Sequence, residues 1–226
     1  MYIEIKGINF KYSNNKENTL NDFGLNIKKG EIVSIFGESG SGKSTLLRII
    51  AGLEKPINGS IKISDKVMVE NNIFESPENR GLSMVFQDYA LFPHMTVEKN
   101  IKFGLKNKSK QEKNEILDKM LKLVELVGYK DRYPYELSGG QQQRIALARA
   151  LAPEPSVLLL DEPFSNLDSD LQQGIREELK RIIKFTNTTT IFVTHDREDC
   201  KAIADRVVIL NKGKIVKQGK VKDILK

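Results

Sequence analysis

Apolar and polar residues alternate along several short stretches of the chain, and these stretches are predicted to be β-strands. In the first part of the sequence they are residues 2–5, 24–37, 60–69 and 80–87. Within residues 60–69, Ile61 alternates with Ile63 and Val67 with Val69, so that each pair shares one face. Alternation of this kind is typical of an antiparallel sheet with one face in water.

From about residue 96 to residue 133 the apolar residues instead recur at helical spacing. The apolar stripe consists of Ile116, Leu117, Met120, Leu121, Leu123 and Val124. A stripe of this width predicts the core of a larger helical lobe.

After this lobe, strands and helices alternate. The expected order is a strand at 157–160, a helix at 170–185, a strand at 190–194, a short helix and a hairpin at 207–219. Because alternating strands and helices form a parallel sheet covered by helices, the predicted fold class is α/β.

Composition narrows the function classes. The 226 residues carry a net charge of +6, with 36 basic residues against 30 acidic ones. Such a mixture favours an ordinary solvated surface over one built for nucleic acid or anionic lipid. The single cysteine, Cys200, excludes an intrachain disulfide and fits a reducing, cytoplasmic location. The first residues lack the apolar core of a signal peptide, and no apolar run approaches the ~20 residues that cross a bilayer.

The clearest chemical motif is GESGSGKST, at residues 37–45. It fits G-x-x-x-x-G-K-[ST], a loop whose backbone N–H groups wrap nucleotide phosphates. The apolar strand before it and the helix from Ser44 to Ala51 after it favour this interpretation over a mere glycine-rich turn. The residues expected to bind ATP here are Gly37, Glu38, Ser39, Gly40, Ser41, Gly42, Lys43, Ser44 and Thr45.

Further candidates end the predicted strands. Asp161 and Glu162 follow four apolar β-formers, where Asp161 can hold Mg²⁺ with Ser44, and Glu162 can act as general base toward the attacking water. His195 ends another strand and is expected to bond the γ-phosphate, although a lone histidine is more often an ordinary surface or core residue. Gln87 ends the strand SMVFQ and is a candidate for sensing Mg²⁺ or water.

Taken in order, these motifs resemble the ATP-binding subunit of ABC transporters, from about residue 2 to residue 226. The matching parts are the phosphate loop, Gln87, LSGGQQQRIALARAL from Leu137, LLLDEP ending at Pro163, SNLD from Ser165, and His195. The resemblance implies a P-loop NTPase core with a mixed sheet, an antiparallel β subdomain and an inserted α-helical subdomain. It implies ATP and Mg²⁺ as cofactors, and it puts Tyr12 against the adenine ring.

The same resemblance gives LSGGQ a role in a second subunit. Leu137, Ser138, Gly139, Gly140 and Gln141, near the start of a helix expected from Gln141, would meet the γ-phosphate bound by the opposite chain. The expected assembly is an ATP-dependent head-to-tail homodimer, with Asp168 at its interface.

Partners are expected from the segment that follows Gln87. By the family resemblance, Tyr89, Leu91, Phe92 and Pro93 contribute to a groove that receives a separate membrane permease; the alternative is that Leu91 and Phe92 pack inside the helical lobe. His94 is expected to be part of this surface and not a metal ligand. The expected location is peripheral, at the cytoplasmic face of the cell membrane, with an extracytoplasmic solute-binding protein as a further partner.

The predicted domain organisation is one ABC ATPase domain over residues 1–226. Residues 1–87 and 155–226 form its nucleotide-binding core, and residues 88–154 form the helical subdomain with the signature motif. The sequence is expected to lack the small β-rich regulatory domain that usually follows in this importer subgroup.

The favoured function is bacterial import, with ferric iron as the cargo. Polyamines, sulfate or molybdate, and sugars remain alternative cargoes. An ABC-type ATPase acting on nucleic acid is the alternative from another class, but the coiled-coil insertions, zinc cysteines and fused second ATPase of such proteins are missing from this sequence. A nucleotide-binding regulator without turnover conflicts with the presence of Glu162 and His195.

Overall fold

The computed structural model describes residues 1–14, 16–166 and 169–225, and these form two sheets and the helices around them. The smaller sheet is antiparallel. Its strands, in spatial order, are β2 (Leu20–Ile27), β1 (Ile3–Phe10), β4 (Asn58–Ile63), β5 (Lys66–Glu70) and β6 (Ile73–Phe74).

The larger sheet is mixed. Its strands, in spatial order, are β11 (Lys214–Lys220), β10 (Arg206–Asn211), β3 (Ile32–Phe36), β9 (Thr189–Thr194), β8 (Val157–Asp161) and β7 (Leu82–Val85). All neighbours are parallel except β10 and β11, which form the predicted hairpin. The predicted α/β class and mixed sheet are therefore confirmed.

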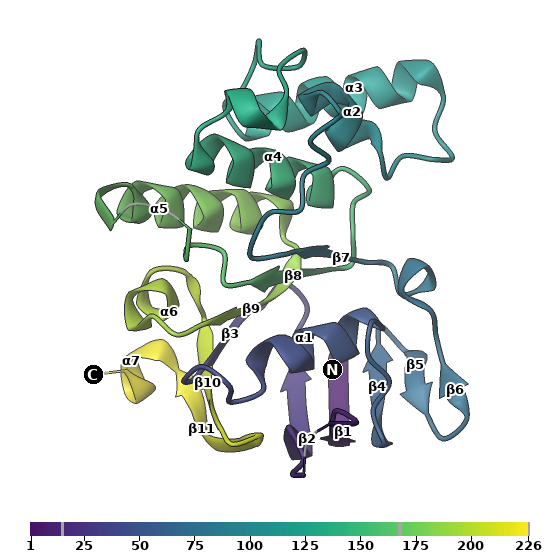
Figure 1. Cartoon of the computed structure of the whole chain (residues 1–226), viewed down its shortest axis with the longest axis vertical. Coiled ribbons are helices and arrows are strands. Elements are labelled where there is room, and N and C mark those ends of the chain that lie inside the picture. Colours follow the sequence, from purple (N-terminus) through teal and green to yellow (C-terminus); the bar gives the residue numbers. More distant parts are fainter. Residues whose placement is uncertain (15, 167–168, 226) are drawn as a thin grey trace.

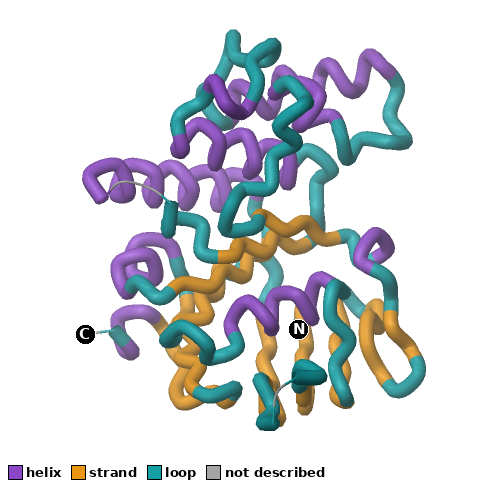
Figure 2. Tube along the Cα trace, viewed as in Figure 1, coloured by secondary structure: helices purple, strands orange, loops and turns teal. Residues whose placement is uncertain are grey.

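Helices cover the larger sheet, as Figure 1 shows, and α1 lies between the two sheets. The α-helices are α1 (Lys43–Ala51), α2 (Val97–Lys102), α3 (Lys110–Leu123), α4 (Gly139–Leu151), α5 (Ser169–Thr186), α6 (Arg197–Ile203) and α7 (Val221–Ile224). Two short 3-10 helices, η1 (Pro77–Asn79) and η2 (Pro134–Glu136), lie in the connections. In Figure 2, helices gather at one end of the molecule and the antiparallel sheet at the other.

Two apolar cores lie on the two faces of the larger sheet. Side chains along β8 alternate between them: Leu158 and Leu160 pack with α2–α5, whereas Val157 and Leu159 pack with α1 and the antiparallel sheet. Because successive side chains on a strand point to opposite faces, a continuous apolar run such as VLLL is what a strand buried on both sides requires.

Three predicted strands need correction. Residues 24–37 are not one strand, because the Glu31 N–H donates to the Lys28 carbonyl and the resulting turn separates β2 from β3. The strand predicted to reach Gln87 ends at Val85. Between β4 and β5 a register shift brings Met68 and Val69 into the core together and leaves Val67 half-buried, so the simple alternation fails there.

Residues 96–133 are helical in part only. The predicted continuous pattern divides into α2 and α3, and Ser109 begins α3 with a capping box in which its hydroxyl accepts from the Glu112 N–H. The predicted lobe of residues 88–154 holds α2, α3 and α4. Its boundaries remain a prediction.

Candidate functional site: a cavity at the carboxyl edge of the parallel strands

The register of the larger sheet brings the candidate residues to a single edge. Phe36, the last residue of β3, pairs with Thr194 at the end of β9, and Asp161 at the end of β8 pairs with Val193. The segments that leave these strands therefore start side by side, at the carboxyl edge where open α/β sheets bind ligands.

The phosphate loop follows β3 and folds around its own lysine. Lys43 is 4% exposed, and its ammonium donates to the carbonyls of Gly37 (2.8 Å) and Glu38 (2.9 Å). Burial lowers the pKa of Lys43, and the carboxylates of Glu162 and Asp161 partly offset this. The loop is thus held closed around a cation that faces two acidic groups.

Gly42 is required where the loop enters α1. Its φ of 103° lies in the left-handed region, and a Cβ there would lie 2.8 Å from the Thr19 carbonyl oxygen. The β10–β11 turn supports the loop from the other side, since the Gly213 N–H donates to the Ser41 carbonyl.

A cavity of about 1160 Å³ opens beside this loop. It is wide enough for a nucleotide, since small-ligand sites usually measure about 300–1000 Å³. The predicted residues that line it are Tyr12, Ser39, Gly40, Gly42, Lys43, Ser44, Thr45 and Glu162. Gly37, Glu38 and Ser41 belong to the loop itself.

The cavity is also lined by residues that the sequence analysis did not identify. Lys16, Asn18 and Thr19 come from the connection between β1 and β2, and Lys212 comes from the β10–β11 turn. Lys212 lies 169 positions after Lys43, so no local pattern pointed to it. Lys16 and Lys212 bring two positive charges to the cavity and Glu17 brings one negative charge, and the net positive charge suits a polyanionic ligand.

Tyr12 is fixed against the cavity wall. The centroids of the Tyr12 and Phe10 rings lie 4.7 Å apart in an edge-on arrangement. The Tyr12 hydroxyl lies 3.2 Å from Thr45 Oγ1. An aromatic face held in this way suits a planar ring in the cavity.

Ser44 and Asp161 bring hard oxygen atoms together. The Ser44 hydroxyl donates to Asp161 Oδ1 at 2.8 Å, across the boundary between α1 and β8. Burial raises the pKa of Asp161 and so does the charge of Glu162, whereas the bond from Ser44 lowers it. The carboxylate of Asp161 and the hydroxyl of Ser44, with the carboxylate of Glu162 nearby, supply the oxygen ligands that Mg²⁺ prefers.

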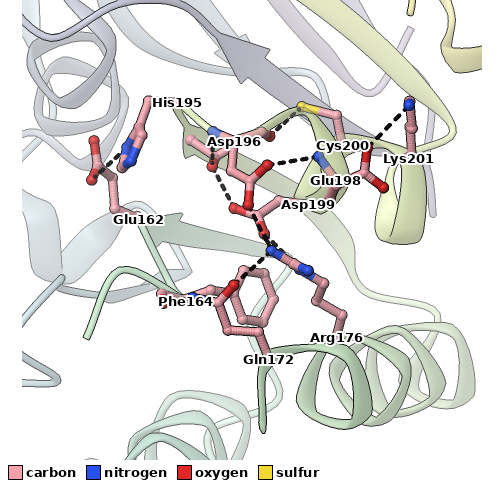
Figure 3. Close-up of polar contacts among 11 residues, drawn as sticks. Glu162, Phe164, Gln172, Arg176, His195, Asp196, Glu198, Asp199, Cys200 and Lys201 are labelled. Carbon is pink, nitrogen blue, oxygen red and sulfur yellow. Dashed lines mark hydrogen bonds and ion pairs between the residues drawn. The ribbon is translucent and has the colours of Figure 1, made fainter. Parts of the chain in front are cut away.

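Glu162 and His195 form a pair at the same edge. His195 Nδ1 lies 3.2 Å from Glu162 Oε2, within hydrogen-bonding distance (Figure 3). The His195 side chain is 60% exposed and that of Glu162 is 19% exposed. Glu162 has a φ of 45°, a strained value for this residue type, and strain of this kind concentrates at functional sites.

Other predicted residues do not line the cavity. Among the residues that the structure describes, these are Asp161, Gln87, His195 and residues 137–141, although Asp161 and His195 contact the lining residues Ser44 and Glu162. Gln87 is exposed beyond β7, and its carbonyl accepts from Asn166 Nδ2. Asp168 lies outside the described residues.

The signature motif begins α4 two residues earlier than predicted. Ser138 is the N-cap: its hydroxyl accepts from the Gln141 N–H, and Gln141 Oε1 accepts from the Ser138 N–H. Leu137 is buried, while Ser138 and Gly139 are exposed. The N-terminus of α4 is therefore presented on the surface of the helical lobe.

The segment predicted to contact a permease is partly core. Tyr89 is 4% exposed and packs with the helical lobe, with Leu91 against the same core. Pro93 is exposed, and Phe92 is half-buried with its ring 4.4 Å from that of Phe103. Tyr89 thus belongs to the interior and not to the exposed patch that was predicted to include it.

Two side chains hold this segment in place. Arg149 donates to the carbonyls of Tyr89 and Ala90, which both have positive φ. Asn100, fully buried, accepts from the Phe92 N–H and donates to the carbonyls of Phe92, Met95 and Thr96. The connection is therefore braced by α2 and α4.

Replacing Tyr89 with phenylalanine is expected to stabilise the protein by about 1 kcal/mol, because a buried hydroxyl without a partner costs free energy. Among the described residues, the Tyr89 hydroxyl has no hydrogen-bond partner, and burial raises its pKa. Denaturant unfolding of both proteins measures the difference. A matched Tyr135→Phe change removes an exposed hydroxyl and should have no effect; a destabilised Tyr89→Phe protein would contradict the assignment.

None of the helices in the described residues is long and apolar enough to cross a membrane. The family model of the ABC transporter matches residues 20–165, a stretch that runs from β2 to the segment just after Glu162. The chain belongs to this family.

Members of the ABC transporter family from several bacteria are similar to the chain. An Fe(3+) ions import ATP-binding protein from Pectobacterium atrosepticum is 45% identical over 220 residues, which cover 96% of this chain and 61% of that protein. A sulfate/thiosulfate import ATP-binding protein from Shewanella oneidensis is 46% identical over 230 residues, which cover 99% and 63%. The chain spans about three fifths of the length of these relatives.

Solved structures of the family share the fold. The cbiO1 protein from Clostridium perfringens, part of an ABC transporter complex, has a TM-score of 0.89 and 31% identity, covering 99% of this chain and 90% of that one. A dimeric post-hydrolysis ATP-binding cassette bound to ADP and Pi has a TM-score of 0.82 and 34% identity, covering 97% and 98%. The P-loop NTPase core of the predicted fold class is thereby confirmed.

Proposed function

We propose that the chain binds ATP and Mg²⁺ in this cavity and hydrolyses ATP to power solute import through a separate membrane permease. The observation that carries the proposal is the Glu162–His195 pair, because Glu162 lines the cavity together with Lys43 and His195 lies within hydrogen-bonding distance of Glu162. Phosphoryl transfer to water requires groups that bind the phosphates, a base for the attacking water and a residue that positions this base.

Each residue has a proposed role. Lys43 and the loop amides bind the phosphates, and Tyr12 stacks on the base. Ser44 and Asp161, with Gln87, would hold Mg²⁺, which neutralises charge on the phosphate oxygens when bound. Glu162 orients and deprotonates the attacking water, while His195 bonds the γ-phosphate and holds Glu162 in place.

Two copies complete the site in this proposal. The cavity is open toward solvent, and Ser138 and Gly139 are exposed at the start of α4, where the positive end of the helix dipole favours an anion. In a head-to-tail dimer these groups would meet the γ-phosphate of the opposite copy, with Asp168 at the interface. The dimeric cassette described above supports this assembly.

The cargo proposal rests on the relatives. Similar proteins carry names for both Fe(3+) import and sulfate import, and we favour ferric iron. Polyamine, oxyanion or sugar import are the alternatives. The site of action would be the cytoplasmic face of the membrane, with permease contacts through Leu91, Phe92 and Pro93 and with an extracytoplasmic solute-binding protein that delivers the cargo.

Uptake of radiolabelled ferric iron and sulfate by iron-starved source cells tests the cargo. Cells whose only copy carries Glu162→Gln are expected to lose iron uptake and keep sulfate uptake, because only the coupled permease loses its energy source. Cells with Glu177→Gln, an exposed carboxylate on α5, serve as the matched control. If iron uptake is unchanged and sulfate uptake is lost, sulfate would replace ferric iron as the proposed cargo.

A further inference from the structure

Arg176 lies at the centre of a buried polar network next to the Glu162–His195 pair. It projects from α5, its side chain is 11% exposed, and it forms ion pairs with two aspartates (Figure 3). Nη2 donates to Asp196 Oδ2 and Nε donates to Asp199 Oδ1, both at 2.7 Å. The planar guanidinium thus bridges two separate carboxylates with a fixed geometry.

Both aspartates are hydrogen-bonded to the hydroxyl of Thr194, the residue before His195. The Thr194 hydroxyl donates to Asp199 Oδ2 and accepts from the Asp196 N–H. Asp196 Oδ1 accepts from the Glu198 N–H and caps α6. His195 lies between Thr194 and Asp196 in the chain. Arg176 holds the carboxylate that accepts from the Thr194 hydroxyl, and it also holds the side chain of Asp196.

The same side chain also contacts the segment after Glu162. The Arg176 guanidinium lies over the ring of Phe164, 5.7 Å from its centroid, and Phe164 is almost fully buried. Gln172, one turn earlier on α5, donates to the Phe164 carbonyl and accepts from Arg176 Nη2. One guanidinium is consequently in contact with the segment that follows Glu162 and with the two aspartates beside His195.

We propose that Arg176 is a positioning residue for ATP hydrolysis: it sets the separation of Glu162 and His195 by clamping the segments that carry them. The inference rests on the proposed function. Because a misplacement of about 1 Å can cost about 100-fold in rate, small changes in this clamp reach the chemistry.

The Arg176→Lys variant separates positioning from simple charge neutralisation. It keeps the positive charge beside Asp196 and Asp199 but cannot bond both of them with a planar fork. Arg176→Lys is expected to lower kcat by about tenfold, with ATP affinity unchanged and the unfolding midpoint close to that of the wild type. Arg181→Lys, on the same helix with an exposed ion pair to Glu125, is the matched control and should leave all three quantities unchanged.

A double-mutant cycle tests whether Arg176 acts through His195. If it does, Arg176→Lys has little effect on single-turnover hydrolysis in a His195→Ala background. Equal losses of kcat in both backgrounds would overturn the inference, as would a lysine variant with wild-type kcat. A wild-type protein without ATP hydrolysis would instead refute the proposed function.

Histidine NMR gives a second test that needs no turnover. The chain has two histidines, and His94 packs near Phe92 in another part of the fold. In the Arg176→Lys protein the His195 ring signals are expected to shift while those of His94 stay in place. Coincident His195 signals in wild type and variant would overturn the clamp whatever the kinetics show.

Discussion

Glu162→Gln is expected to lower ATP hydrolysis by at least about 100-fold while ATP still binds, since a positioned general base contributes about 10²–10⁴-fold. Glutamine keeps the size of the side chain and its approach to His195 but cannot take a proton from water. Lys43 and the loop amides, which would hold the phosphates, are untouched. Phosphate release at saturating ATP, together with equilibrium binding of a fluorescent ATP analogue, measures the two effects separately.

The same variant is expected to accumulate as an ATP-bound dimer. Hydrolysis would normally reopen the assembly, so blocking it leaves the closed state populated, and size-exclusion chromatography with ATP would detect the dimer. Glu177→Gln should behave as the wild type. A Glu162→Gln protein that is fully active and monomeric would refute the proposed mechanism.

Arg80→Met is expected to destabilise the protein by about 3 kcal/mol, because it strands buried carbonyl oxygens that the guanidinium now satisfies. Arg80 is 2% exposed and donates to the carbonyls of Ile49, Ile50 and Glu75. Burial lowers its pKa to about 10, so it remains charged at neutral pH. The loss corresponds to a midpoint about 6–12 °C lower, measurable by thermal unfolding.

Gly52 shows how closely the structure surrounds this arginine. Gly52 ends α1 with a φ of 84°, and a Cβ there would lie 2.5 Å from Arg80 Nε. The guanidinium therefore occupies the space beside the C-terminus of α1, where a cation is also favoured by the helix dipole. Arg181→Met removes an exposed arginine and is the control; equal midpoints for the two variants would contradict this role.

Local patterns predicted the elements that carry the site. Residues 32–51 form a strand, a glycine-rich loop and a helix, and four apolar residues precede Asp161. These patterns can be recognised from residues that are neighbours along the chain. For that reason α1, β8 and β9 were placed correctly to within a few residues, and the end of β3 was also correct, although its start was not. Asp161, Glu162 and His195 were also expected at strand ends, and the register brings these ends together.

The errors arose where a short-range pattern met a long-range contact. Apolar spacing across residues 24–37 gave no sign that β2 and β3 join different sheets. Tyr89 was predicted to lie on an exposed apolar patch, but it is buried in the core that includes α2 and α4. The register shift between β4 and β5 is set by strand pairing, which no single strand encodes.

The sequence by itself determined the family motifs, the α/β class and the identity of the phosphate loop, because these depend on residues close together in the chain. Only the tertiary structure decided that Lys212 reaches the cavity, that Arg80 holds the end of α1, and that Arg176 joins the supports of Glu162 and His195. Contacts of this kind join segments far apart in sequence, and their partners are selected by how the sheets and helices pack.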